Sequence, residues 1–155
     1  MIKIEQCSFM ISPFEVGKMN ELFLQLSPKA TPLDKEKIHL VLSRSFIFLA
    51  IDTKKKNHMC PIGMIVGMAS ITFIPKLSGT IGQIEDVVVD KNYRKKGIAR
   101  KLMRKLLQLA KEKDRHVRHI DLTCNPSREA ANLLYQNIGF KHRLTNSYRL
   151  TFTSA

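Results

Sequence analysis

Apolar positions along the chain follow two spacings, one typical of strands and one typical of amphipathic helices. Met19, Leu22, Phe23 and Leu26 recur at the i, i+3, i+4, i+7 spacing of a single helix face, which predicts a helix over Pro13 to Ser27. The same spacing predicts helices over Gly97 to Lys113 and Ser127 to Ile138, and Thr31 with Pro32 predicts a helix start that runs on to Ser43. Apolar runs predict strands over Ile2 to Phe9, Phe46 to Asp52, Pro61 to Ile74, Ile81 to Val89, Val117 to Cys124 and Phe140 to Phe152.

This order of elements predicts a single α/β domain over residues 1–155, with a mixed sheet of about six to seven strands and about four helices. The chain has 155 residues, enough for one domain with a sizeable core. We see no linker, internal repeat or low-complexity tract that would divide it.

Charge and cysteine usage narrow the classes of protein further. Lys and Arg number 26 against 13 acidic residues, a net charge of +13, which favours a polyanionic partner. The cysteines number three and lie far apart, so no disulfide framework is predicted. The N-terminus lacks the features of a signal peptide, and the longest apolar stretch, Pro61 to Ile71, is too short to span a bilayer. We therefore expect a cytoplasmic protein with no membrane partner.

Most of the positive charge falls in one segment. Twelve Lys and Arg residues but only two acids lie between Lys91 and Arg118, where a valine-rich strand gives way to a helix. Unpaired backbone amides and the helix dipole make a helix N-terminus a site for phosphate, and Gly97 with Ala99 lets a ligand approach the backbone closely. The segment matches neither a Walker A loop nor a dinucleotide fingerprint. A solvated basic helix face is the alternative reading.

Two motifs together resemble those of the GNAT superfamily of N-acetyltransferases. Arg94-x-x-Gly97-x-Ala99 resembles the acyl-CoA motif Arg/Gln-x-x-Gly-x-Gly/Ala, and it follows the strand Ile84 to Val89. About thirty residues later, the segment Asn125 to Phe140 resembles the second signature of that family, Asn-x-x-Ala-x-x-x-Tyr-x-x-x-Gly-Phe. The resemblance covers Ile81 to Phe140 and departs from the usual pattern at Lys91, where many members carry proline.

The resemblance implies a mostly antiparallel sheet with a splayed central cleft, and acetyl-CoA as co-substrate. The backbone amides of Lys95 to Ala99 would hold the pyrophosphate, and the strand Asp86 to Val89 would pair with the pantetheine arm. The residues expected to bind the cofactor are Val87, Val88, Val89, Arg94, Lys95, Lys96, Gly97, Ile98, Ala99, Arg100, Asn125, Arg128, Asn132 and Tyr135.

The resemblance also implies a direct transfer to an amine, with no acyl-enzyme. The Val87 amide would stabilise the oxyanion, Glu85 would accept the amine proton directly or through water, and Tyr135 would protonate the departing thiolate. Each assignment has a plainer alternative. Tyr135 lies at core spacing and can be an ordinary buried tyrosine, and Glu85 can simply pair with a lysine, with Asp86 next to it.

The acceptor is a small-molecule or peptide amine that these residues do not single out. Glu85-Asp86-Val87-Val88-Val89 resembles the corresponding strand of the glucosamine-phosphate N-acetyltransferases, which suits a basic protein with an anionic substrate. Polyamines are disfavoured by the net positive charge. The resemblance also allows a homodimer.

Two rival functions remain, a non-enzymatic nucleic-acid binder and a catalytically inactive CoA-binding module. Nucleic acid is disfavoured because no aromatic residues interleave with the basic ones. No metal site is expected, because the pairs His116/His119 and His58/Cys60 gather no further ligands. Cys124 is expected to be a small buried residue at a strand end rather than a nucleophile.

Overall fold

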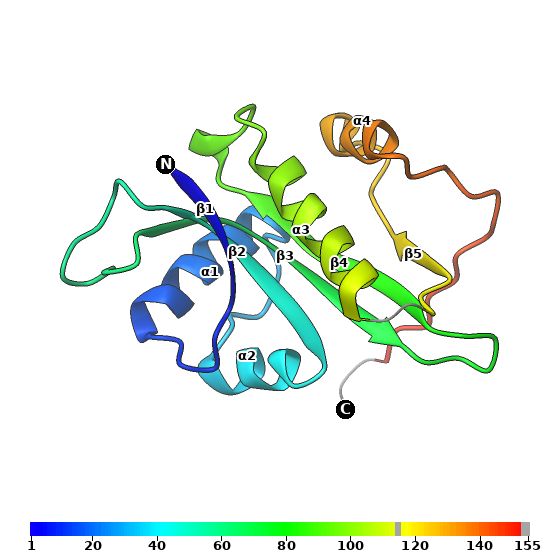
Figure 1. Ribbon diagram of the computed structural model, residues 1–155, viewed down its shortest axis with the longest axis horizontal. Helices are drawn as coiled ribbons and strands as arrows, with labels where there is room; N and C mark the ends of the chain where they lie inside the picture. Colours follow the sequence, from blue (N-terminus) through cyan, green and yellow to red (C-terminus); the bar gives the residue numbers. More distant parts are fainter. Residues whose placement is uncertain (114–115, 153–155) are drawn as a thin grey trace. The chain divides into compact units, whose positions relative to one another are not determined.

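The structure, a computed structural model, describes residues 1–113 and 116–152, and it divides into two compact units (Figure 1). The first unit spans Met1–Thr123 and the second begins at Cys124. The first unit contains β1 (Ile2–Gln6), α1 (Pro13–Leu26), α2 (Lys35–Leu42), β2 (Ser45–Asp52), β3 (Met64–Ile74), β4 (Ile81–Val89), the short 3₁₀ helix η1 (Lys91–Tyr93), α3 (Ile98–Lys113) and β5 (His119–Leu122). The second unit contains α4 (Glu129–Ile138).

The strands of the first unit form one mixed sheet in the order β1-β2-β3-β4-β5. The first three pairings are antiparallel, and β4 pairs with β5 in parallel. The α/β class, the mostly antiparallel sheet and the four α-helices agree with the sequence predictions. The predicted count of six to seven strands is wrong, because the sheet described here has five.

The closing strand predicted over Phe140 to Phe152 is absent, since these residues have no regular secondary structure. The apolar residues that suggested a strand are exposed, among them Leu144, Leu150 and Phe152. A strand needs a neighbour to pair its backbone groups. Within the described residues, nothing pairs with this segment.

The two faces of the sheet carry different helices. Ile47, Leu49 and Ile51 alternate along β2 and pack with Met19 and Leu22 of α1 and with Ile38 of α2. The intervening positions, Phe48 and Ala50, turn to the opposite face, where α3 crosses the sheet (Figure 1). Helix α3 buries one apolar stripe, which contains Ile98, Leu102, Met103, Leu106 and Ala110. Its exposed cationic residues are Arg100, Lys101, Arg104, Lys105 and Lys111.

Local capping sets where α1 and α2 begin. At α1, the Ser12 hydroxyl accepts a hydrogen bond from the Glu15 amide, while the Glu15 carboxylate accepts one from the Ser12 amide. The predicted N-cap of the second helix, Thr31, is wrong. Asp34 caps α2 instead, with its Oδ1 accepting from the Lys37 amide at 2.7 Å. None of the helices within the described residues is long and apolar enough to cross a membrane.

Candidate functional site

The turn that follows β4 is fixed by Asp90. The Asp90 amide donates to the Val66 carbonyl at 2.9 Å, which continues the β3–β4 pairing by one residue. The Asp90 carboxylate accepts from the Asn92 amide at 2.8 Å, and the Asp90 carbonyl accepts from the Tyr93 amide at 2.8 Å. These bonds form η1 and set the direction in which the chain enters the segment before α3.

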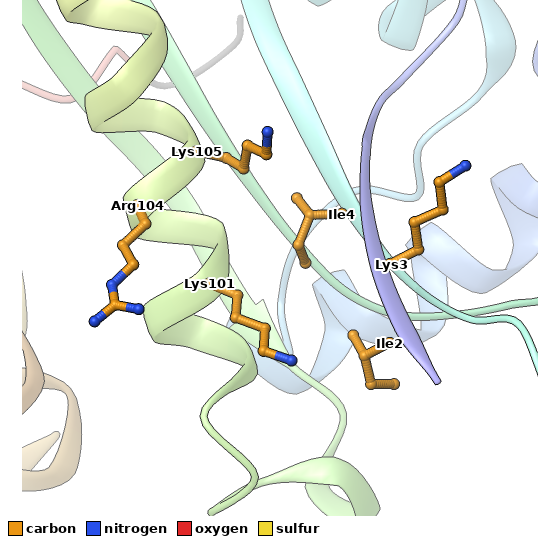
Figure 2. A pocket seen from close by; sticks show the side chains of 6 residues that line it. All are labelled: Ile2, Lys3, Ile4, Lys101, Arg104 and Lys105. Atoms are coloured by element: carbon orange, nitrogen blue, oxygen red, sulfur yellow. The ribbon is translucent and has the colours of Figure 1, made fainter.

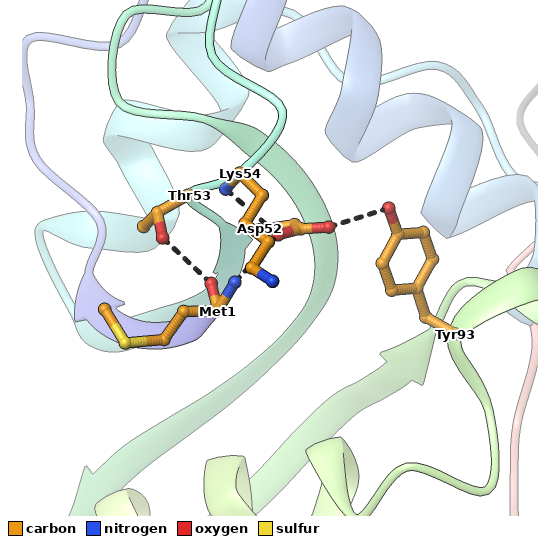
Figure 3. A network of polar contacts seen from close by, with 5 residues as sticks. All are labelled: Met1, Asp52, Thr53, Lys54 and Tyr93. Carbon is orange, nitrogen blue, oxygen red and sulfur yellow. Dashed lines mark hydrogen bonds and ion pairs between the residues drawn. The ribbon is translucent and has the colours of Figure 1, made fainter.

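Tyr93 ties this turn to the end of β2 (Figure 3). Its hydroxyl donates to Oδ2 of Asp52 at 3.1 Å, while Oδ1 accepts from the Lys54 amide at 3.1 Å. Desolvation acts to raise the pKa of Asp52, but the hydrogen bonds from Lys54, Tyr93 and the N-terminal amine outweigh it and lower that pKa. The carboxylate therefore stays charged and holds the Tyr93 hydroxyl in place.

The segment from Arg94 to Gly97 has an unusual backbone. Lys95 has φ +61° and Gly97 has φ +72°, so two residues on either side of Lys96 lie in the left-handed region. A Cβ atom added at Gly97 would meet nothing within 4 Å. Glycine therefore suits this position because the backbone is left-handed, and not because neighbouring atoms leave no room for a side chain. Alternation of left-handed residues turns successive amides toward one concavity, which is the geometry of an anion-binding nest.

The first amides of α3 are available to a ligand. The first backbone bond of the helix runs from the Lys101 amide to the Gly97 carbonyl at 3.1 Å. No hydrogen bond found among the described residues uses the amides of Gly97 to Arg100. These amides share the positive end of the helix dipole, so together they can bind a phosphate group.

The basic side chains around this loop divide into two pairs. Nε of Arg94 donates to the Val89 carbonyl at 3.2 Å, and Nζ of Lys96 donates to the Asn92 carbonyl at 3.1 Å. The Lys96 ammonium also lies 4.8 Å from the centre of the Tyr93 ring. Lys95 and Arg100 are exposed and make no such bond within the described chain. Arg94 and Lys96 thus shape the loop, while Lys95 and Arg100 project free charge.

Strand β4 carries a bulge next to the candidate base. Ser70 faces Glu85 and Met68 faces Val88, so Asp86 and Val87 together oppose the single residue Ala69. Asp86 has φ +55°, the left-handed conformation that kinks the strand there. This bulge could not be predicted, because Asp86 and Val87 continue an ordinary strand pattern in the sequence.

Two adjacent carboxylates mark this bulge. Glu85 is exposed and its Oε1 accepts from Nε2 of Gln83 at 3.0 Å. Desolvation, together with the neighbouring charge of Glu85, raises the pKa of Asp86, while Lys37 acts in the opposite direction. Either carboxylate is a candidate to accept a proton from a substrate, and the geometry alone does not choose between them.

Beyond the bulge, β4 has one free edge. Its parallel pairing with β5 ends at Ile84 and Leu122, whereas β4 continues to Val89. Val87 is half-buried, and Val88 and Val89 are buried. The backbone from Glu85 to Val89 therefore has no partner in β5.

In the second unit, Asn125 and Asn132 organise the turn before α4. Oδ1 of Asn125 accepts from both the amide and the hydroxyl of Ser127, each at 2.9 Å. Nδ2 of Asn132 donates to the carbonyls of Asn125 at 3.0 Å and Arg128 at 3.1 Å. Both side chains thus hold the helix start, and Arg128 is exposed beside them.

Tyr135 is buried on α4 and stays protonated. Its ring packs edge-on against Phe140, with the ring centres 6.2 Å apart. Burial raises the pKa of Tyr135 to about 12, the Cys124 thiol adds to the shift, and Arg128 opposes it. Cys124 itself is half-buried, which corrects the expectation of a buried residue, and burial raises its pKa too.

The structure brings the residues expected at the site together in two groups. Glu85, Val87 to Val89 and the loop to Arg100 lie in the first unit, and Asn125 to Tyr135 lie in the second. The sequence analysis did not identify Gln25, Asp52 and Tyr93. Hydrogen bonds of these residues to partners far away in the sequence hold the turn before α3 in place. No local pattern could have shown such long-range contacts.

Comparison with known proteins gives this fold and these motifs a family. A profile of the Acetyltransferase (GNAT) family matches residues 18–140. A glucosamine 6-phosphate N-acetyltransferase of Trypanosoma brucei brucei is 34% identical over 84 residues, which are 52% of this chain and 54% of that protein. The chain thus spans about half the length of this relative.

Solved structures share the fold at lower sequence identity. An acetyltransferase of Trypanosoma brucei superposes with a TM-score of 0.75 at 21% identity, covering 98% of this chain and 100% of that one. A glucosamine-6-phosphate N-acetyltransferase of Arabidopsis thaliana also gives 0.75 at 21% identity, with 97% and 98% of the two chains covered. Because the family profile matches well over half of the residues, from α1 through α4, this chain belongs to the GNAT acetyltransferase family.

Proposed function

We propose that the protein is an N-acetyltransferase that moves the acetyl group of acetyl-CoA directly to a primary amine. The observation that carries this proposal is the row of uncapped amides from Gly97 to Arg100, with left-handed backbone at Lys95 and at Gly97 itself. A diphosphate satisfies such amides, and a helix N-terminus adds its dipole to the attraction.

The chain's own residues fit the acetyl-CoA that the family implies. The loop amides would hold the pyrophosphate, with the exposed charges of Lys95 and Arg100 beside them. Arg94 and Lys96 would contribute through the loop conformation that their hydrogen bonds maintain. The free edge of Val87 to Val89 would pair with the amide-bearing pantetheine arm.

Acetyl-CoA supplies a thioester, so the amine nitrogen forms the new C–N bond while the C–S bond breaks. The Val87 amide, at the bulge of β4, would stabilise the negative charge on the carbonyl oxygen. An amine of the lysine type has a pKa of ~10.4 and must lose a proton first. Glu85 would accept it, directly or through water, with the Asp86 carboxylate as its competitor.

Tyr135 is the proposed donor to the departing sulfur. A pKa of about 12 keeps the phenol protonated at neutral pH. A thiol has a pKa of ~8.5, so complete transfer of the phenol proton to a free thiolate is unfavourable. Tyr135 therefore acts by hydrogen bonding as charge grows on sulfur, or by transfer concerted with departure. Asn125, Arg128 and Asn132 remain proposed cofactor contacts beside it.

For the acceptor, we favour a phosphorylated amino sugar. The 34% identical relative is named for glucosamine 6-phosphate, and the β4 residues Glu85 to Val89 resemble the strand of such enzymes. A net charge of +13 also favours an anionic substrate. A cytoplasmic location and a homodimer stay predictions.

An amine-panel assay that follows released CoA tests the proposal. Sugar phosphates, amino acids, polyamines and N-terminal peptides are compared at equal concentration, with acetyl-CoA in excess. Release that is fastest with amino sugar phosphates supports both the activity and the acceptor. A thermal shift with acetyl-CoA but no thiol release with any amine would indicate an inactive CoA-binding module. A shift with an oligonucleotide but not with acetyl-CoA would indicate a nucleic-acid binder.

A further inference from the structure

A groove of about 380 Å³ lies in the first unit between the edge strand β1 and helix α3. It is lined by Ile2, Lys3, Ile4, Lys101, Arg104 and Lys105, and we call it the β1–α3 groove. Figure 2 shows Ile2 and Ile4 on the side of β1 that faces the helix, with Lys101 and Lys105 extending toward the strand. Lys3 and Arg104 also line the groove, but their charged ends extend away from the space between the two elements. The groove therefore has an apolar strand side and a cationic helix side.

The cations of the groove have no partner in the described part of the chain. No side-chain hydrogen bond or ion pair engages Lys101, Arg104 or Lys105 there. Lys101 and Lys105 are four positions apart on one helix face, and like charges at that spacing destabilise a helix. Lys3 differs, because it pairs with Glu5 on the opposite face of β1. Helix α3 thus bears a repulsive pair that an anion would relieve.

The neighbouring strand has an open edge. β1 is the first strand of the sheet and pairs only with β2 in the described chain. At the two ends of that pairing, the Cys7 amide donates to Ile47 at 2.8 Å and the Thr53 amide donates to Met1 at 3.0 Å. Antiparallel pairing alternates, so odd-numbered residues of β1 bond to β2 and the peptide groups of Ile2, Ile4 and Gln6 face outward.

We propose that an extended, glutamate-rich segment of a partner protein docks in the β1–α3 groove by adding to the open edge of β1. Lys101 and Lys105 are separated by ~6 Å along the helix, from four residues at ~1.5 Å each. Alternate side chains of an added strand are spaced at ~6.8 Å. Glutamates two positions apart on that strand therefore match both ammonium groups, and their methylenes lie against Ile2 and Ile4.

The charge of the chain selects this occupant over two others. A second copy would bring another net charge of +13 and the same lysines to the groove, which disfavours pairing between identical edges. Nucleic acid supplies negative charge, but the groove offers isoleucine and no aromatic ring on which bases could stack. A glutamate-rich strand satisfies the cations, the apolar side and the open backbone together.

The test measures the fluorescence anisotropy of a labelled eight-residue peptide of alternating glutamate and threonine on addition of the protein. We expect binding that the double variant Lys101→Glu/Lys105→Glu weakens about tenfold or more, because repulsion replaces attraction. The matched control, Lys35→Glu/Lys76→Glu, changes the net charge equally at exposed positions outside the groove and should bind within about twofold of the parent. Equal weakening by both variants would overturn the proposal, because it would show attraction by net charge alone.

Two further probes separate strand addition from simple charge attraction. Backbone N-methylation on one set of alternate peptide residues should abolish binding, while methylation on the other set should leave it, because only one set faces β1. Equal binding of both methylated peptides would overturn the docking mode. A single-stranded oligonucleotide of equal charge that bound more tightly than the peptide, and lost binding in Lys101→Glu/Lys105→Glu, would overturn the choice of partner.

Discussion

Gln25, near the end of α1, donates from Nε2 to Oδ2 of Asp90 at 3.2 Å although the two residues are 65 positions apart. Its Oε1 accepts from the Lys91 amide at 2.9 Å, so one carboxamide bridges both sides of the turn after β4. This turn leads into the loop whose amides we assign to the diphosphate. Helix α1 thereby positions the proposed cofactor loop without touching the cofactor.

Replacing Gln25 should loosen that loop. Gln25→Ala removes two hydrogen bonds, and we expect it to lower the free energy of unfolding by about 1–2 kcal/mol. The dissociation constant of acetyl-CoA should rise about fivefold, with kcat nearly unchanged, because the reacting groups stay in place. Calorimetric titration and urea unfolding measure the two effects. Gln136→Ala, an exposed change on α4, is the control, and an equal rise in both variants would contradict the positioning role.

Gly97 should matter to both folding and binding. Gly97→Ala places a Cβ at φ +72°, where a non-glycine residue costs about 1–2 kcal/mol, although the space around it is open in the protein. The same Cβ would stand where phosphate approaches, so acetyl-CoA affinity should fall about tenfold or more.

Gly17→Ala provides the matched comparison. Gly17 lies inside α1, and an added Cβ would meet nothing within 4 Å. This change should stabilise the protein by about 0.5–1 kcal/mol and leave affinity unaltered. Thermal unfolding with and without acetyl-CoA measures both variants. Unchanged affinity in Gly97→Ala would remove the glycine from the binding site.

Tyr135→Phe should lower kcat about tenfold or more while the acetyl-CoA dissociation constant stays nearly constant. The phenol is protonated below its pKa of about 12, so the parent enzyme should show no loss of kcat from phenol ionisation up to pH 10. Tyr148→Phe, at an exposed tyrosine outside the site, should be neutral. Turnover of Tyr135→Phe equal to that of the parent would leave Tyr135 an ordinary buried tyrosine.

The two carboxylates at the β4 bulge can be ranked by isosteric changes. Glu85→Gln should lower kcat about tenfold or more near pH 7, and the loss should shrink as the pH approaches the amine pKa, where no base is needed. Asp86→Asn keeps a residue type that tolerates the left-handed backbone and should change kcat less than about threefold. The measurement is kcat against pH for both variants. The reverse ranking would assign the base to Asp86.

Sequence patterns predicted the central part of the fold well. The bounds of β4 are those expected, and α3 buries the apolar stripe that its spacing predicted. Both elements have a strong local periodicity of apolar residues, and the structure buries the face that this periodicity predicts. The position of the turn between them was also predicted, and its phosphate-binding role stays a prediction.

Features that depend on distant partners could not be predicted. Thr31 and Asp34 are both residue types that favour the N-cap position. Asp34 caps the helix in the structure, where the Asn20 side chain bonds both the amide and the carbonyl of the preceding residue, Leu33. The segment after Phe140 has an alternating apolar pattern, yet periodicity does not supply a partner strand. The hydrogen bonds of Arg94 and Lys96 are invisible in sequence, where every basic residue of the loop looks equally free.

In our proposal, the amides at the start of α3 bind the diphosphate of acetyl-CoA. Titration of ¹⁵N-labelled protein with acetyl-CoA, followed by amide chemical shifts, reports on these groups themselves. We predict the largest, saturable shifts at Lys95 to Arg100. Saturable binding that leaves these six amides unmoved would contradict the account.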